Sequence, residues 1–137
     1  MAGYGMRPYV YASGGYNSGG FTEYPILDGD ATSIFTGDFI LQEANGYVTV
    51  LAITPTGANA LASTVGVAVG FRYKDADGEP VWSQRYVGHA DNTEAFAFVA
   101  DNPTQQFLIQ QDSIGGIIGQ AEVGENAPVD IIAGSAS

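Results

Sequence analysis

The chain contains no cysteine and very few basic residues. Its 137 residues include 4 Lys+Arg against 15 Asp+Glu, which gives a formal net charge of -11 at pH 7. Without cysteine there can be no disulfide, no thiolate metal ligand and no cysteine nucleophile. Binding to nucleic acid or to an anionic membrane draws on clustered Lys and Arg. We therefore expect neither of these as a partner.

Charge of either sign is scarce, and long apolar runs are lacking. Charged residues make up 14% of the chain, against about 25% in a typical soluble domain. The polar surface must therefore come from uncharged side chains, which suits a protein packed against neighbours. No apolar run approaches the roughly 20 residues of a membrane helix. The N-terminus also lacks the charged and apolar regions of a signal peptide.

What the chain does contain is a series of short strand-like segments separated by turn signals. Asn45-Gly46 is a strong hairpin signal, and residues 75–79 (DADGE) mark another turn. In residues 80–87 (PVWSQRYV), an unbroken strand would place Trp82 and Tyr86 on the same side. No helical periodicity of three turns or more is present. The pattern predicts an all-β fold, in which residues 25–137 form a single small β-barrel or sandwich domain.

The clearest strand pattern lies in residues 93–113, which we interpret as two strands around a turn. Apolar residues recur with period 2 along both strands: Phe96, Phe98, Ala100, Phe107 and Ile109. This spacing is typical of half-buried strands. Residues 101–103 (DNP) favour a turn, because Asp and Asn bond their own backbone and Pro restricts φ. We expect this strand pair to build the core, with the face that carries Gln106 and Gln110 covered by a neighbouring subunit.

Residues 1–24 differ from the rest, because Gly and Tyr dominate and aliphatic residues are few. A Gly-rich chain does not order itself, whereas aromatic side chains offer a large contact area at a low entropic cost. We predict that these residues form an extended arm that lies on a neighbouring subunit; a disordered tail is the alternative. The candidate partner-binding residues are Tyr4, Arg7, Tyr9, Tyr11, Tyr16 and Phe21.

Candidate catalytic and metal motifs are incomplete. Residues 75–79 lack the full ligand set and the helical flanks of a calcium loop, so we expect a plain turn. His89, the only histidine, has Asp91 and Glu94 near it in sequence, but a general base needs its partners in space. Residues 115–119 (GGIIG) lack the Lys-Ser/Thr of a phosphate loop. We expect no enzyme activity, cofactor or resident metal, and leave open a weak Ca²⁺ or Mg²⁺ site between subunits.

Several short motifs resemble those of one group of virion proteins. They are residues 5–8 (GMRP), 11–19 (YASGGYNSG), 34–38 (IFTGD), 66–71 (GVAVGF), 98–103 (FVADNP), 107–110 (FLIQ), 123–127 (VGENA) and 134–135 (GS). In spacing and in residue type they are similar to small structural proteins of tailed-phage heads. The resemblance implies a decoration, or cement, protein on the outer surface of a bacteriophage capsid. It further implies binding to the major capsid protein and a homotrimeric state, and it brings no catalytic residues.

The aromatic residues permit a second hypothesis, that of a virion surface module. Such a module would recognise host glycans by stacking sugars on side chains near Trp82 and Tyr86, with Tyr73 as a further candidate. The competing interpretation is that these rings pack inside the barrel.

Overall fold

The computed structural model describes residues 5–15, 20–51, 64–91, 93–111 and 118–125. The predicted all-β class is confirmed. The described residues form ten β-strands and one short 3₁₀ helix, η2 (Gln120–Glu122). None of the helical structure within them is long and apolar enough to cross a membrane. Of the motif and site residues named above, Tyr4, Tyr16 and residues 17–19, 112–117, 126–127 and 134–135 lie outside the described part of the chain.

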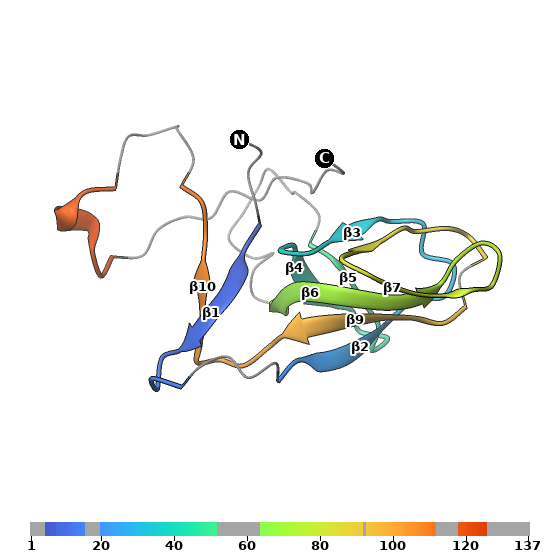
Figure 1. Ribbon diagram of the computed structural model, residues 1–137, viewed down its shortest axis with the longest axis horizontal. Helices are drawn as coiled ribbons and strands as arrows, with labels where there is room; N and C mark the ends of the chain where they lie inside the picture. Colours follow the sequence, from blue (N-terminus) through green and yellow to red (C-terminus); the bar gives the residue numbers. More distant parts are fainter. Residues whose placement is uncertain (1–4, 16–19, 52–63, 92, 112–117, 126–137) are drawn as a thin grey trace.

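Five strands close into a barrel (Figure 1). They are β2 (Thr22–Ile26), β4 (Phe39–Gln42), β5 (Val48–Val50), β6 (Thr64–Lys74) and β9 (Ala95–Ala100). Their order is β4-β5-β2-β9-β6, and β6 pairs back with β4 to complete the circle. All of these pairs are antiparallel except β2–β5, where Ile26 lies opposite Val48.

Strand β6 is long enough to pair with two different strands along one edge. Its 11 residues pair with β4 near the N-terminal end and with the edge strand β7 (Pro80–Ser83) near the C-terminal end. The β6–β9 register shifts between Ala68 and Gly70, and the β4–β6 register shifts at Ile40 and Leu41. Such irregularities bend strands and increase their twist, which allows a small sheet to close.

The interior of the barrel is filled by apolar side chains from every barrel strand. The buried cluster comprises Ile26, Ile34, Ile40, Val48, Ala68, Phe71, Tyr73, Tyr86, Ala95, Ala97 and Val99. A two-stranded pair, β3 (Ile34–Phe35) and β8 (Arg85–Tyr86), contributes Ile34 and Tyr86. The Tyr86 ring meets Tyr73 edge-on at 5.3 Å, and its hydroxyl donates to the carbonyl oxygen of Asp30 at 2.8 Å. The buried phenol is therefore satisfied, as burial requires.

Both predicted turns are present. At the Asn45-Gly46 turn, Gly46 has a φ of 88°, and Asn45 Oδ1 accepts a hydrogen bond from the Tyr47 amide at 3.1 Å. At residues 75–79, Asp75 Oδ1 accepts hydrogen bonds from the amides of Asp77 and Glu79 at 3.0 and 2.9 Å. The Asp75 carboxylate is thus engaged by its own turn, as a plain hairpin turn predicts.

The strand after β9 leaves the barrel. Strand β10 (Gln105–Leu108) pairs with β1 (Arg7–Tyr11) in a separate antiparallel ribbon (Figure 1). The two strands and the turn predicted in residues 93–113 are present, but the expectation that these strands pair with each other and build the core together was wrong. Strand β9 already has β2 on one edge and β6 on the other, so neither edge is left for β10. The 101–104 turn redirects the chain, with the Thr104 amide donating to Asn102 Oδ1 at 2.9 Å.

Parts of the predicted arm are built into the sheets of their own chain. Strand β1 pairs with β10, and Thr22, Glu23 and Tyr24 pair with β9. The boundary predicted at residue 24 falls inside β2. The pairing satisfies backbone donors and acceptors that a free arm would leave to water. Contact of the arm with a neighbouring subunit stays a prediction.

Two expectations about side-chain direction need correction. Phe96 and Phe98 do share a face, but it is the outer one, while Ala95, Ala97 and Val99 of the same strand point into the core. Trp82 and Tyr86 do not share a side, since Trp82 is 70% exposed and Tyr86 is fully buried. The chain bends at Gln84 between β7 and β8, and this break resets the alternation that an unbroken strand would have kept.

Candidate functional site

The outward face of the β1–β10 ribbon carries large apolar side chains that are exposed to solvent. Tyr9 is 57% exposed, Leu108 is 48% exposed, and Ile109, just past the strand, is 51% exposed. Arg7 lies opposite Leu108 in the register, and Gln106 is exposed on the same side. We call Arg7, Tyr9, Gln106 and Leu108, together with the exposed Ile109 that follows β10, the ribbon face. Arg7 is the single charged residue in segments 7–11 and 105–111.

The structure brings together only some of the predicted partner-binding residues. Arg7 and Tyr9 share the ribbon face, as positions two apart on a strand should. Tyr11 is half-buried, with its ring close to Gly15 and Gly20, and Phe21 is half-buried just before β2. Leu108 and Ile109 were missed as site residues. The alternation of β10 did place Leu108 beside Gln106, but it could not show that β1 would lie next to them.

The inner side of the ribbon docks on the barrel through few contacts. The Met6 amide donates to the Gly37 carbonyl at 3.2 Å, whereas the hydrogen bond from the Gln105 side chain to the Val10 carbonyl, at 3.3 Å, joins the two ribbon strands to each other. A Cβ atom on Gly5 or Gly37 would lie 2.7 Å from the Cα atom of the other. That spacing is too close for any side chain, so two glycines let the backbones meet.

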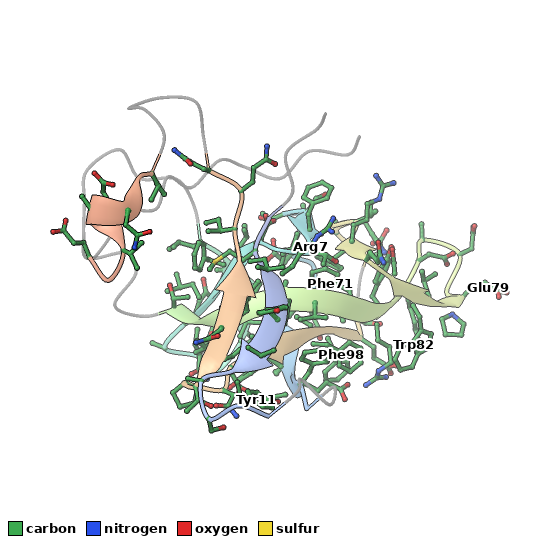
Figure 2. All side chains as sticks on the ribbon, turned by 60° about the vertical axis from the view of Figure 1, so that its left-hand side comes forward. Arg7, Tyr11, Phe71, Glu79, Trp82 and Phe98 are labelled. Carbon is green, nitrogen blue, oxygen red and sulfur yellow. The ribbon has the colours of Figure 1, made fainter. Side chains whose placement is uncertain are left out.

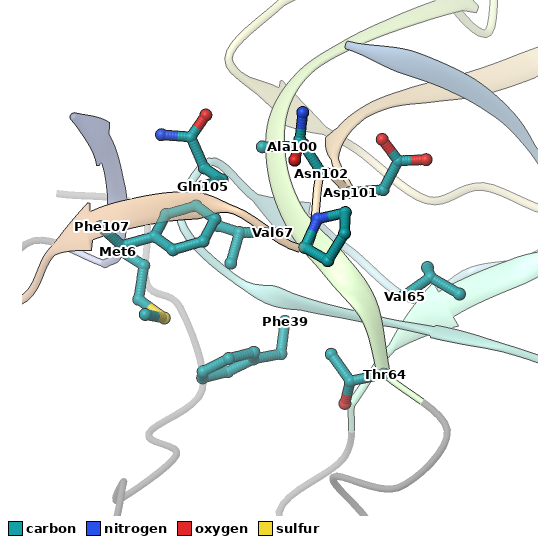
Figure 3. A pocket seen from close by; sticks show the side chains of 12 residues that line it. Met6, Phe39, Thr64, Val65, Val67, Ala100, Asp101, Asn102, Gln105 and Phe107 are labelled. Carbon is teal, nitrogen blue, oxygen red and sulfur yellow. The ribbon is translucent and has the colours of Figure 1, made fainter. Parts of the chain in front are cut away.

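A pocket of about 240 Å³ lies between the ribbon and the barrel (Figure 3). Met6 and Phe107 line it from the ribbon side, and Phe39, Val65 and Val67 line it from the barrel. Drug-sized ligands occupy pockets of about 300–1,000 Å³. The space is therefore small for such a ligand, and it shows that the ribbon is not packed tightly onto the barrel.

A second surface lies on the outer face of the sheet formed by β2, β9, β6 and β7. Trp82 stacks on Phe98 with ring centroids 5.6 Å apart and planes 12° apart. The Arg72 guanidinium carbon lies 4.4 Å from the Phe96 ring centroid and 5.9 Å from that of Trp82. Arg72 also forms an ion pair with Glu23. We call Trp82, Phe98, Phe96, Arg72 and Glu23 the aromatic platform.

Strand register explains how the aromatic platform forms. Arg72 in β6 lies opposite both Trp82 in β7 and Phe96 in β9. Phe98 lies opposite Gly70, which has no side chain. The indole of Trp82 can therefore reach diagonally across β6 to Phe98, a distance that aromatic side chains span between strands. In Figure 2 the two labelled side chains lie near each other, with Trp82 farther from Tyr11 of the ribbon.

His89 makes a single hydrogen bond to backbone in the described structure. Its Nε2 lies 3.2 Å from the Lys74 carbonyl oxygen, and its Nδ1 is buried without a partner among the described residues. Lys74 in turn forms an ion pair with Glu94 at 2.9 Å. Asp91 and Glu94 lie close to His89 in sequence. Within the described residues, neither of their carboxylates makes a hydrogen bond with the His89 ring among the contacts that the structure gives. Proximity in sequence did not translate into a catalytic arrangement.

Two titratable groups have shifted pKa values. Burial raises the pKa of the Asp38 carboxyl, and the hydrogen bond from the Phe35 amide, at 2.9 Å, opposes this in part. The pKa of Tyr24 is also raised, first by burial and then by its hydrogen bond to Asp101 and the negative charge there. The Tyr24 hydroxyl donates to Asp101 Oδ2 at 2.9 Å.

A metal ion would need several His, Asp or Glu side chains grouped around one point in the described part of the chain. No group of three or more His, Asp or Glu side chains there is placed to hold a metal ion. No family model, curated protein or solved structure matches the chain. Function must therefore be argued from the ribbon face and the aromatic platform themselves.

Proposed function

We propose that the chain is a structural virion protein that decorates and stabilises a bacteriophage capsid by binding the lattice of the major capsid protein. The observation that carries the proposal is the ribbon face, where Tyr9, Leu108 and Ile109 stand about half exposed or more at one end of a closed barrel. Large apolar side chains gathered on one surface mark sites of protein–protein contact. The resemblance of the motifs to tailed-phage head proteins supplies the class of partner.

The charge distribution supports a protein contact at this end of the molecule. The chain carries a net charge of -11, yet segments 7–11 and 105–111 contain only Arg7 as a charged residue. Burying this surface therefore removes few charges from water. Desolvation of charges is the main cost of covering a polar surface, so this cost is small here. Interface cores are likewise poor in charged residues and rich in aromatic ones.

The strength of such attachment depends on repetition. Fully burying one Leu, Ile or comparable side chain contributes about 1.5–3 kcal/mol, so a single ribbon gives modest binding. A homotrimer would engage three lattice sites at once and convert modest contacts into tight attachment. Because the protein would bind the assembled lattice and not its dissociated subunits, binding would stabilise the shell by linkage.

A co-sedimentation experiment tests the proposal. Empty expanded capsids, assembled from the major capsid protein of a tailed phage, are mixed with purified protein and pelleted. We expect saturable binding and a higher capsid melting temperature. The double variant Tyr9→Ser, Leu108→Ser should bind at least 10-fold more weakly, because it removes two apolar contacts of the ribbon face. Trp82→Ser is the control, since it removes an even more exposed aromatic side chain from the other surface and should bind normally.

Two results would contradict this function. Wild-type protein that stays in the supernatant at every capsid concentration would exclude capsid attachment. Normal binding by the double variant, with circular dichroism showing an intact fold, would exclude the ribbon face as the contact. Sedimentation equilibrium tests the oligomer separately, with an expected mass of three times the 14.3 kDa of one chain.

A further inference from the structure

The indole of Trp82 is exposed although the fold has apolar surfaces that could cover it. It is 70% exposed, the highest exposure among the large apolar side chains of the described residues. Leaving such a ring in water forgoes about 1.5–3 kcal/mol of burial free energy. Val81 and Ser83, its neighbours on β7, are half-buried in the usual alternation, so the direction of Trp82 is set by the strand.

The position of the ring is fixed. Stacking on Phe98 covers one face of the indole, and such aromatic pairs contribute about 0.5–1.5 kcal/mol beyond burial. Strands β7, β6 and β9 are joined in one hydrogen-bonded sheet. Since one face is covered and most of the side chain is still exposed, the opposite face is open to water. This is a preorganised flat surface for a ligand to stack on, with little ordering cost on binding.

Hydrogen-bonding groups lie at the side of this surface. The Arg72 and Glu23 side chains are 36% and 39% exposed and paired with each other. Arg offers five N–H donors and a carboxylate offers about four acceptor sites, so their mutual bond leaves capacity for a ligand. We propose that the aromatic platform binds a neutral hexopyranose unit of a surface polysaccharide. The C–H face of the sugar stacks on Trp82, and its hydroxyls bond Arg72 and Glu23.

Charge favours a neutral sugar over other occupants. The positive charge of Arg72 is compensated by Glu23, and the chain as a whole carries -11. An anionic sugar therefore meets no free positive charge locally and repulsion from the whole protein. A protein partner typically covers about 800 Å² on each side, whereas the platform offers one fully exposed ring, with Phe96 and Phe98 half-buried.

The proposal does not depend on capsid binding. The ribbon lies at one end of the barrel, and β7 extends toward the other end (Figure 1). A ligand on the aromatic platform therefore leaves the ribbon face uncovered, and variants of one surface serve as controls for the other.

The test uses the intrinsic fluorescence of Trp82, which is the only tryptophan in the chain. Purified protein is first applied to an array of neutral bacterial and plant hexopyranose oligosaccharides, together with their sialylated or uronate counterparts. Neutral glycans that bind are then titrated in solution. We expect a saturable change in Trp82 emission, because stacking changes the surroundings of the indole. Trp82→Ala should weaken binding at least 10-fold on the array, and Arg72→Gln should do so in both assays.

The matched control is Tyr9→Ser, Leu108→Ser, which should bind the same sugars as wild type. Three results would overturn the proposal: no binding on the array, preference for the acidic counterparts, or an emission spectrum that shifts with protein concentration in the absence of sugar. The last would show that a second copy covers the ring. Wild-type protein that binds the sugar but does not bind capsids would contradict the capsid function alone.

Discussion

The barrel and the ribbon both contain antiparallel strand pairs but are held together in different ways. In the barrel, β9 is paired on both edges, and its own inward side chains, Ala97 and Val99, are fully buried. In the ribbon, β1 and β10 have only each other within the described residues, and their inward side chains are half-buried over a pocket of about 240 Å³. Closure gives the barrel a core that two strands alone cannot form.

The difference shows where stability and binding are located in the molecule. Regions with few buried apolar contacts open more readily than the core, so the ribbon should be the less stable part. The ribbon also carries the exposed apolar side chains that we assign to the capsid contact. A scaffold that stays closed while its ribbon adapts can fit a lattice without losing its fold.

The largest predicted effect separates the two regions by a matched pair of Phe substitutions. Phe71→Ala removes a side chain that is 1% exposed and packs against Tyr86. It should lower the free energy of unfolding by about 3–5 kcal/mol, since it leaves a cavity in the core. Phe107→Ala removes a half-buried ring from the ribbon and should cost less than about 2 kcal/mol. Urea unfolding followed by circular dichroism measures both.

Equal losses in the two variants would contradict the comparison. They would mean that Phe107 belongs to the same cooperative core as Phe71, and that the ribbon unfolds together with the barrel.

A smaller effect is expected where the ribbon meets the barrel. Gly37 has a φ of 96°, its amide donates to the Ala68 carbonyl at 2.8 Å, and a Cβ there would clash with Gly5. Gly37→Ala should therefore displace the start of β1. We expect hydrogen exchange of the Ala12 amide, which donates to the Thr104 carbonyl, to accelerate at least 10-fold more than exchange of β9 amides.

Gly46→Ala is the control, because Gly46 has a similar φ of 88°. A Cβ atom added there would have no described heavy atom within 4 Å. The variant should show only the cost of a positive φ for alanine, about 1–2 kcal/mol, with no selective effect on the ribbon. The same exchange pattern in both variants would show that the Gly5–Gly37 contact does not hold the ribbon.

Most strands and turns of this fold could be predicted from local sequence, but β1 and part of β2 fell within the predicted arm, and the pairing of the strands could not be predicted. The alternation in residues 95–100 (AFAFVA) is real, yet both of its faces are apolar, so the pattern does not say which one points inward. The interior takes Ala95 and Ala97 beside larger neighbours such as Phe71, and Phe96 and Phe98 are left outside. That choice depends on barrel closure, which is a property of strands far apart in the chain.

The candidate surfaces were predictable to a similar extent. Arg7, Tyr9 and Trp82 could be named because exposed aromatic and cationic residues stand out in composition. Phe98 could not be linked to Trp82, since their contact depends on β6 lying between their strands with Gly70 opposite Phe98. Tyr86 was wrongly grouped with Trp82 because the bend at Gln84 leaves no clear signal in the sequence.

The smallest predicted effect concerns the pH dependence of stability at the contact between the ribbon and the barrel, next to Gly37. Asp38 follows Gly37, and burial raises the pKa of its carboxyl above the ordinary value of 3.8. The neutral acid is therefore favoured in the folded state. Its contribution to stability is fully present below pH 3.8 and is lost as pH rises through the raised folded pKa. Asp38→Asn keeps an oxygen acceptor for the Phe35 amide but does not titrate. Relative to wild type, this variant should gain stability as pH rises above 3.8 and through the raised folded pKa of Asp38.

Urea unfolding of both proteins at several pH values measures this gain. Asp38→Asn also lowers the net negative charge, so Asp77→Asn, in the exposed turn after β6, corrects for that general effect. If the gain persists after this correction, the stability that wild type loses as pH rises is due to burial of the ionised Asp38 carboxylate. This residue lies in the turn that contacts the ribbon. Exchange at the Ala12 amide should then slow in Asp38→Asn at neutral pH, whereas β9 amides should change less. A gain that both variants share equally would instead assign the pH dependence to net charge and leave the junction uninvolved.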